Sequence, residues 1–189
     1  LPIALFVLPW PEAELIPIYG GVFLIHTVYK ILQASAYSKG AYTVVYPVVR
    51  GTGPLFTVFG AYWLFGETFS ATQWIGVGVL LAGIFGLALY NVLFLVSERD
   101  TLWTALGLAM VTGLFVALYT TYDAYGIRTA INPMTFLAWF FVVDSIAIPP
   151  YAVYRWMNMP NRPPVGPLMI RGFIGGTVAF FSFGSIMLA

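Results

Sequence analysis

The chain has 189 residues, of which 60% are hydrophobic, 18% aromatic and only 8% charged, with a formal net charge of +1. Soluble domains carry about 25% charged residues, so this composition excludes an ordinary soluble domain, and without a basic patch we expect no nucleic acid partner. With no cysteine and a single histidine, the chain forms no disulfide, and we expect neither a metal nor a cofactor.

Long apolar segments without charge indicate a polytopic helical membrane protein. No Asp, Glu, Lys or Arg occurs between Glu67 and Glu98 or between Asp100 and Asp123, and each run exceeds the ~20 residues that a helix needs to cross the hydrocarbon core. The expected elements are the end of a helix at 1–10 and spans at about 15–37, 42–66, 71–95, 101–126, 133–155 and from about 168 onward. The predicted fold class is an all-α bundle of transmembrane helices.

The chain starts at Leu1 rather than at a methionine and ends in apolar sequence. We therefore expect a fragment of a longer protein, cut within helices at both ends. Two of its helix starts are marked by capping residues. Ser70 and Gln73 form a capping box before the 71–95 span. Asn132 caps the 133–155 span, and Pro133 occupies the first helical position, where its missing N–H costs nothing.

A polar stripe runs along the 15–37 span. His26, Lys30, Gln33 and Tyr37 are spaced four, three and four residues apart, which places them on one helical face. Such a face does not contact lipid, because a charge in the hydrocarbon core is costly. Two interpretations of Lys30 stay open: it lines a cavity, or it pairs with a buried carboxylate and locks two helices together.

The stretch "VVYPVVRGTGPLF" at 44–56 places a charge and helix breakers inside the 42–66 span. The residues expected to break the helix are Pro47, Gly51, Gly53 and Pro54. Non-helical backbone at membrane depth is tolerated only where it is buried in protein or lines a cavity, so we place Arg50 and its neighbour Tyr46 at a cavity. In the alternative, Arg50 snorkels to the membrane surface beside an incidental kink.

Two carboxylates complete the set of charged residues within the spans. Asp144 falls near the middle of the 133–155 span and is either the partner of Lys30 or Arg50 or a protonatable coupling site. For Asp123, near a helix end, we favour a local pair with Arg128. The residues expected to line the substrate cavity are Lys30, Arg50, His26, Gln33, Tyr46, Asp144, Trp139 and Tyr119. For Trp139 and Tyr119, ordinary packing is the alternative. No catalytic motif is present, so we expect no enzyme.

A weak internal repeat divides the chain. "LPIALFVLPW" at 1–10 and "IAIPPYAVYRW" at 146–156 each end a span with proline, aromatic residues and tryptophan, and each is followed by a polar loop and a glycine-containing helix. The predicted halves are residues 1–97 and 98–189, truncated at the N- and C-terminal ends respectively. Halves of about five helices insert in opposite senses, as in the inverted repeats of many transporters, whose sites lie near the membrane midplane.

The order of these motifs resembles a known family. "YPVVRGTGPLFTVFGAYWLFGE" at 46–67, followed by "SATQWIGVGVLLAGIFGL", is similar to the EamA-like branch of the drug/metabolite transporter superfamily, and "ALYTTYDAYGIR" with "NPMTFLAWFF" looks like the start of its second half. The positions matching the family motif are Pro47, Arg50, Gly51, Gly66 and Glu67. The resemblance implies ten helices in two inverted five-helix repeats, of which this chain lacks the first and the last helices.

The resemblance also implies a function. Family members are secondary transporters that export or exchange small metabolites such as amino acids, by alternating access through a central cavity. We expect a substrate carrying a carboxylate, a lipid bilayer as surroundings and a multi-pass location in a bacterial inner (plasma) membrane. Two alternatives stay open: a membrane structural or signalling subunit that transports nothing, and an intramembrane lipid-modifying enzyme.

Overall fold

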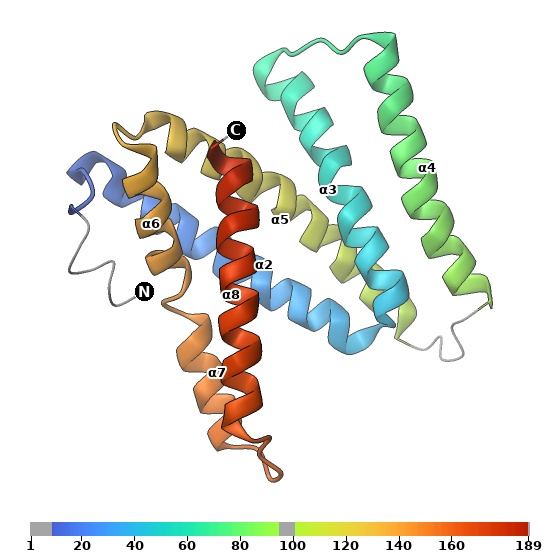
Figure 1. Cartoon of the computed structure of the whole chain (residues 1–189). Helices are drawn as coiled ribbons and strands as arrows, with labels where there is room; N and C mark the ends of the chain where they lie inside the picture. Colours follow the sequence, from blue (N-terminus) through green and yellow to red (C-terminus); the bar gives the residue numbers. More distant parts are fainter. Residues whose placement is uncertain (1–8, 95–100, 189) are drawn as a thin grey trace. The chain divides into compact units, whose positions relative to one another are not determined.

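The computed structural model describes residues 9–94 and 101–188, and the regular structure in these ranges is entirely helical (Figure 1). The first eight residues of the predicted helix end lie outside the described residues. The elements are the short 3-10 helix η1 (Ala13–Leu15) and the α-helices α2 (Ile16–Lys39), α3 (Tyr42–Phe65), α4 (Ala71–Phe94), α5 (Leu102–Thr129), α6 (Pro133–Asp144), α7 (Ile148–Met157) and α8 (Val165–Leu188).

Five helical segments of the described residues are long and apolar enough to cross a membrane. They are Ala13–Lys39, Ala71–Phe94, Leu102–Thr129, Pro133–Met157 and Val165–Ile186. The helix α3 is not one of these five, although its 24 residues span about 36 Å, more than the ~30 Å of the hydrocarbon core. The described chain is therefore an all-α, multi-pass integral membrane protein, as the composition predicts.

Both predicted caps are confirmed. The Ser70 N–H donates to Gln73 Oε1 (2.8 Å), and the Gln73 N–H donates back to Ser70 Oγ (3.4 Å). Asn132 Oδ1 accepts from the N–H groups of Met134 and Thr135, at 3.0 and 3.1 Å. These side chains bind N–H groups that have no partner within the helix, and so fix where α4 and α6 begin.

The prediction of one continuous helix over 133–155 was wrong. The helix α6 ends at Asp144, and α7 begins only at Ile148. Pro149 and Pro150 supply no N–H, so two consecutive backbone hydrogen bonds of a continuous helix are missing at this point. The Ser145 hydroxyl and N–H both turn back to the Val142 carbonyl, at 2.7 and 3.2 Å. We call residues 145–147 the α6–α7 joint.

The helix α3 is more continuous than predicted. It runs without interruption through Pro47 and Pro54. Pro47 leaves the carbonyl of Thr43, four residues earlier, without its helical donor. The side-chain amide of Asn91 on the neighbouring helix α4 donates to that carbonyl at 2.8 Å (Figure 1). The lost backbone bond is thereby replaced, and the helix continues.

Replacement of Asn91 by leucine should test this compensation. We expect the free energy of unfolding in detergent to fall by about 1–3 kcal/mol, because a partly buried carbonyl loses its donor. In a Pro47→Ala background the alanine N–H supplies a helical donor to Thr43, so the same Asn91→Leu change should cost clearly less. An equal cost in both backgrounds would show that Asn91 acts by packing instead.

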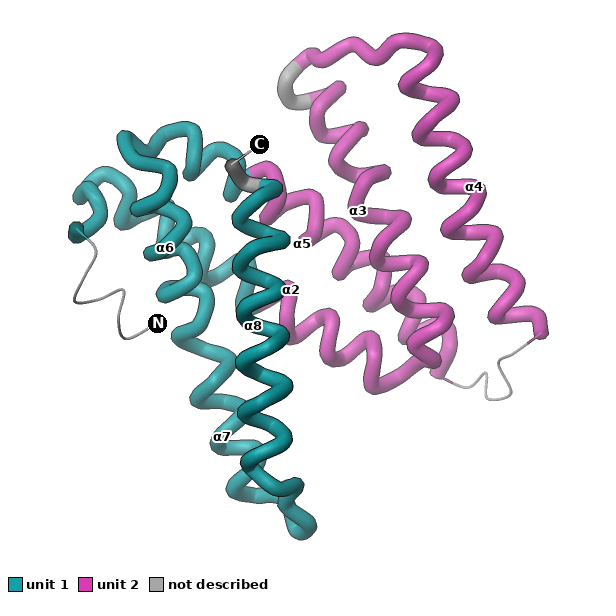
Figure 2. The backbone as a smooth tube through the Cα atoms, viewed as in Figure 1, with its two compact units in different colours: residues 1–27, 122–189 teal, residues 28–121 magenta. Residues whose placement is uncertain are grey.

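The contacts divide the chain into two compact units (Figure 2). Unit 1 comprises residues 1–27 and 122–189, and unit 2 comprises residues 28–121. The buried core of unit 1 is Leu15, Ile18, Tyr19, Val22, Ile127, Phe136, Trp139 and Phe140. The core of unit 2 is Ala36, Val45, Val48, Val49, Ala88, Ala105 and Ala109. Because α2 and α5 contribute to both units, the units describe packing and not sequence repeats, and the halves 1–97 and 98–189 stay a prediction.

Candidate functional site

A cavity of about 730 Å³ lies within unit 2. Residues of α3, α4 and α5 line it: Tyr46, Pro47, Arg50, Gly53, Pro54, Thr57, Val58, Leu80, Ile84, Leu87, Val116 and Thr120. The polar side chains in this lining are one guanidinium, one phenol and two threonine hydroxyls. A largely apolar wall with a few polar groups is the usual construction of a small-molecule site.

Arg50 is the one charged residue of the cavity lining. Within the described ranges, no carboxylate oxygen lies within 4.0 Å of its guanidinium. The guanidinium carbon instead lies 5.4 Å from the centre of the Tyr46 ring, one helical turn earlier on α3. Tyr46 also forms a side-chain hydrogen bond with the guanidinium, and the remaining N–H donors of Arg50 can bind an anion.

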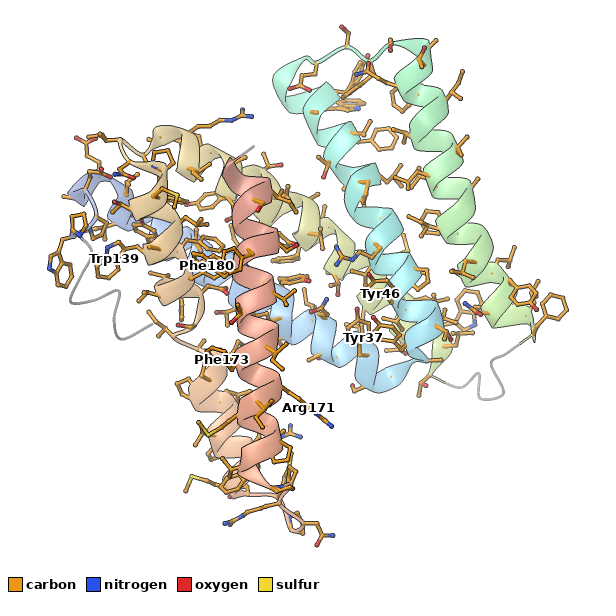
Figure 3. All side chains as sticks on the ribbon, viewed as in Figure 1. Tyr37, Tyr46, Trp139, Arg171, Phe173 and Phe180 are labelled. Atoms are coloured by element: carbon orange, nitrogen blue, oxygen red, sulfur yellow. The ribbon has the colours of Figure 1, made fainter. Side chains whose placement is uncertain are left out.

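Stacked tyrosines extend from Arg50 along unit 2. The ring centres of Tyr42 and Tyr46 are 5.1 Å apart, and those of Tyr37 and Tyr42 are 5.3 Å apart. Figure 3 shows Tyr37 on α2 and Tyr46 on α3. The series therefore carries an aromatic surface from the guanidinium to the end of α2.

A second polar group of unit 2 joins α2 to α5. Gln33 donates from its amide nitrogen to the Tyr29 hydroxyl at 2.8 Å. The rings of Tyr29 and Tyr119 meet edge to face, 5.0 Å between centres. Lys30, beside Tyr29 on α2, is half-buried. Predicted cavity residues are thus gathered here, although they do not line the 730 Å³ cavity itself.

The glycines of α3 were predicted to break the helix, and the structure gives them a different role. A Cβ at Gly51 would lie 2.9 Å from Ile84 on α4, and a Cβ at Gly53 would lie 3.0 Å from Val116 on α5. Both glycines therefore allow neighbouring helices to approach closely, as small residues do in membranes. Among the residues that the structure describes, Gly66 alone adopts the left-handed conformation, with φ of 64°, and it ends α3 as a C-cap.

Unit 1 contains a separate cluster of ionisable side chains. His26 Nε2 lies 2.9 Å from Asp123 Oδ2, and His26 Nδ1 lies 3.4 Å from Asp144 Oδ1. The predicted pair of Asp123 with Arg128 was wrong. Residues five apart on a helix are separated by about 140° around its axis, and Arg128 is exposed whereas Asp123 is buried.

Trp139 lies in the core of unit 1. Figure 3 shows Trp139 on α6. Its indole N–H donates to the Pro9 carbonyl at 2.9 Å, and its ring centre lies 5.1 Å from that of Trp10. Glu67, a position of the motif, is exposed just after α3. Neither residue lines the cavity of unit 2.

The predicted cavity residues therefore fall into two groups. Unit 1 contains His26, Trp139 and Asp144, and unit 2 contains Lys30, Gln33, Tyr46, Arg50 and Tyr119. The sequence analysis missed Tyr29, Tyr42 and the two threonines of the cavity. Tyr29 could have been predicted from the sequence, because it lies four residues before Gln33 and therefore on the same face of α2.

Comparison with known proteins adds one similar chain. No family model and no solved structure matches this sequence. An uncharacterized protein, y4nH of Sinorhizobium fredii, is 31% identical over 77 residues. The match spans 41% of this chain and 66% of y4nH, just under two thirds of that protein's length. The function is therefore argued from the site.

Proposed function

We propose that this protein is a secondary transporter of small metabolites that carry a carboxylate, such as amino acids, and that it works by alternating access. Arg50 binds the carboxylate, and the apolar wall formed by α3, α4 and α5 receives the remainder of the molecule. Transport rather than catalysis is proposed, with the protein in a bacterial inner membrane.

The observation that carries this proposal is the environment of Arg50. Arg50 is exposed at this cavity, and a charge on a helix within the membrane is costly unless it is paired or hydrated. In the described parts of the chain this guanidinium has an aromatic neighbour but no carboxylate within 4.0 Å. A substrate anion supplies the missing partner, and it leaves again when water enters the cavity.

The sequence resemblance supports the same conclusion independently. Pro47, Arg50 and Gly51 match the EamA-like motif, and the structure places all three on α3. We propose on this basis that the complete protein has the ten-helix inverted-repeat fold. Five apolar helices of the described chain agree with a large bundle of this kind.

Efflux from proteoliposomes tests the function. Vesicles containing the complete protein are loaded with a radiolabelled amino acid mixture, and the label released is measured over time. We expect Arg50→Ala to slow release by about 10-fold or more, because a hydrogen bond to a charged group contributes about 1.5–3 kcal/mol. Arg50→Lys should retain part of the activity, since a lysine is a point charge without the planar fork of arginine.

Two further variants show whether a loss of release is specific to the proposed site. Lys30→Ala tests the polar face of α2 and should also reduce release. Arg171→Ala is the matched control, because Arg171 is an exposed arginine on α8 (Figure 3) and does not line the cavity. Full activity with unchanged substrate range in both Arg50→Ala and Lys30→Ala would refute the site, and no release by the wild type would favour a subunit that transports nothing.

A further inference from the structure

The His26 cluster of unit 1 is a buried arrangement of three ionisable groups from three helices. The side chains of His26, Asp123 and Asp144 are 7%, 2% and 20% exposed. The rings of Phe140 and Phe183 meet the imidazole edge to face, with centres 5.1 and 6.5 Å away. Each nitrogen of the imidazole faces a different carboxylate.

This geometry bears on how many protons the cluster can hold. A neutral imidazole has one N–H donor and one bare nitrogen. With one proton on the cluster, the bare nitrogen would point its lone pair at a carboxylate oxygen. Both contacts are attractive only when a second proton is present, either on the ring or on the carboxyl group. The contacts of His26 with Asp123 (2.9 Å) and Asp144 (3.4 Å) therefore fit a cluster that can bind a second proton.

Few other charged residues occur on the described helices that form the cluster. Along α2, Lys30 follows His26 by one turn. The charged residues of α5 and α6 are the two aspartates and the exposed Arg128, and the phenol of Tyr122 is adjacent to Asp123 in the chain. The one charged residue of α8 is Arg171, about 18 Å along the helix from Phe183.

Two features make the cluster suited to exchanging a proton. Asp123 Oδ1 is buried and has no hydrogen-bond partner in the described part of the chain, so it can accept a further hydrogen-bond donor. The longer of the two contacts, from His26 to Asp144, involves the last residue of α6. The α6–α7 joint follows directly, and it is the place where the helical hydrogen bonding already stops.

We propose that His26, Asp123 and Asp144 form a proton-binding site, and that release of its proton opens the His26–Asp144 contact and frees the α6–α7 joint. The proton is taken from water and returned to water, and no other bond changes. This inference deepens the proposed function. The proton site stands by itself, whereas the claim that its proton drives transport rests on the proposed function. Broken helices frequently form ion sites in transporters.

Nitrogen NMR of the histidine ring tests the proton site without any substrate. His26 is the single histidine of the chain, so ¹⁵N-histidine labelling gives one pair of ring signals, assigned by their loss in His26→Gln. In Asp123→Asn and in Asp144→Asn, we expect the pH midpoint of the ring signals to differ from that of the wild type by about one unit or more. Glu67→Gln, which removes an exposed carboxylate, should leave the midpoint unchanged.

Hydrogen exchange tests the joint in the wild type, so the result does not depend on a variant that folds. The Ser145 and Ile146 N–H groups donate to the carbonyls of Val142 and Val143. Their protection, corrected for the intrinsic effect of pH, should fall on the order of tenfold when the proton leaves, because the joint then opens locally. The capped N–H of Thr135, at the other end of α6, should keep its protection.

The outcomes separate the two proposals. An unchanged ring midpoint in both aspartate variants, or protection of Ser145 and Ile146 that does not follow the titration, overturns the proton site. With the site established, efflux by the wild type should depend on the pH gradient, and Asp144→Asn should abolish that dependence while still exchanging labelled amino acid. A dependence that persists in Asp144→Asn overturns the coupling, and a wild type without any efflux overturns the transport function but not the proton site.

Discussion

His26→Leu is expected to lower the free energy of unfolding by about 3–5 kcal/mol, because removing one member of a buried ion pair leaves the other charge without compensation. Asp123 is 2% exposed, and its Oδ2 lies 2.9 Å from His26 Nε2. Its other oxygen already has no partner in the described residues. The free energy of unfolding is measured in mild detergent micelles by titration with a denaturing detergent.

The double variant His26→Leu/Asp123→Leu is the control for this prediction. Replacing a buried pair by apolar side chains of similar size is often neutral or stabilising. The double variant should therefore recover part of the loss, although Asp144, which is 20% exposed, still loses its contact with His26. An equal loss in the single and the double variant would mean that the imidazole contributes through its contacts with Phe140 and Phe183, and not through its charge.

Gly113→Leu is expected to have the second large effect. A Cβ at this position of α5 would collide with the side chain of Thr52 and would lie 3.2 Å from the backbone nitrogen of Gly53 on α3. Backbone cannot rotate away as a side chain does. Overpacking costs about 1–3 kcal/mol for added methylenes, and a whole leucine should push α3 from α5 and deform the cavity wall.

The control for this change lies on the same helix. A Cβ at Gly107 would meet nothing within 4 Å, so Gly107→Leu introduces the same side chain into open space. The melting temperature in detergent, followed by size-exclusion chromatography, should fall clearly for Gly113→Leu and stay within about one degree for Gly107→Leu, since surface changes are usually within ±0.5 kcal/mol. Similar melting temperatures for both variants would contradict the close approach of α3 and α5.

The positions of the helices were predictable because their signals are local. The caps at Ser70 and Asn132 act within one helical turn, and the structure places the starts of α4 and α6 directly after them. The consequences of proline were not predictable in the same way. Pro47 removes a single bond that Asn91 replaces, whereas Pro149 and Pro150 remove two in succession, and only the second situation ends the helix.

In the candidate sites, too, some features could be predicted from the sequence and others could not. Their polar residues were recognisable because a charge within a span is unusual, and Arg50 does line a cavity. The residues that these polar side chains contact could not be predicted from the sequence. His26 and Asp123 are 97 residues apart, and their contact depends on how α2 packs against α5 within unit 1. Gly51 and Gly53 were mistaken for helix breakers, since their sequence does not distinguish flexibility from a need for space.

The hydrogen bond between Asn91 and Thr43 also sets how α4 is turned about its own axis. Ala88 and Asn91 are the buried residues of this helix, and they lie three positions apart on one face. Most of the remaining circumference of α4 is exposed leucine, valine, isoleucine and aromatic side chains. Hydrocarbon chains accept any rotation of such a surface equally well. Together with the packing of Ala88 against α3, this amide therefore fixes a rotation of α4 that contact with lipid alone would leave undetermined.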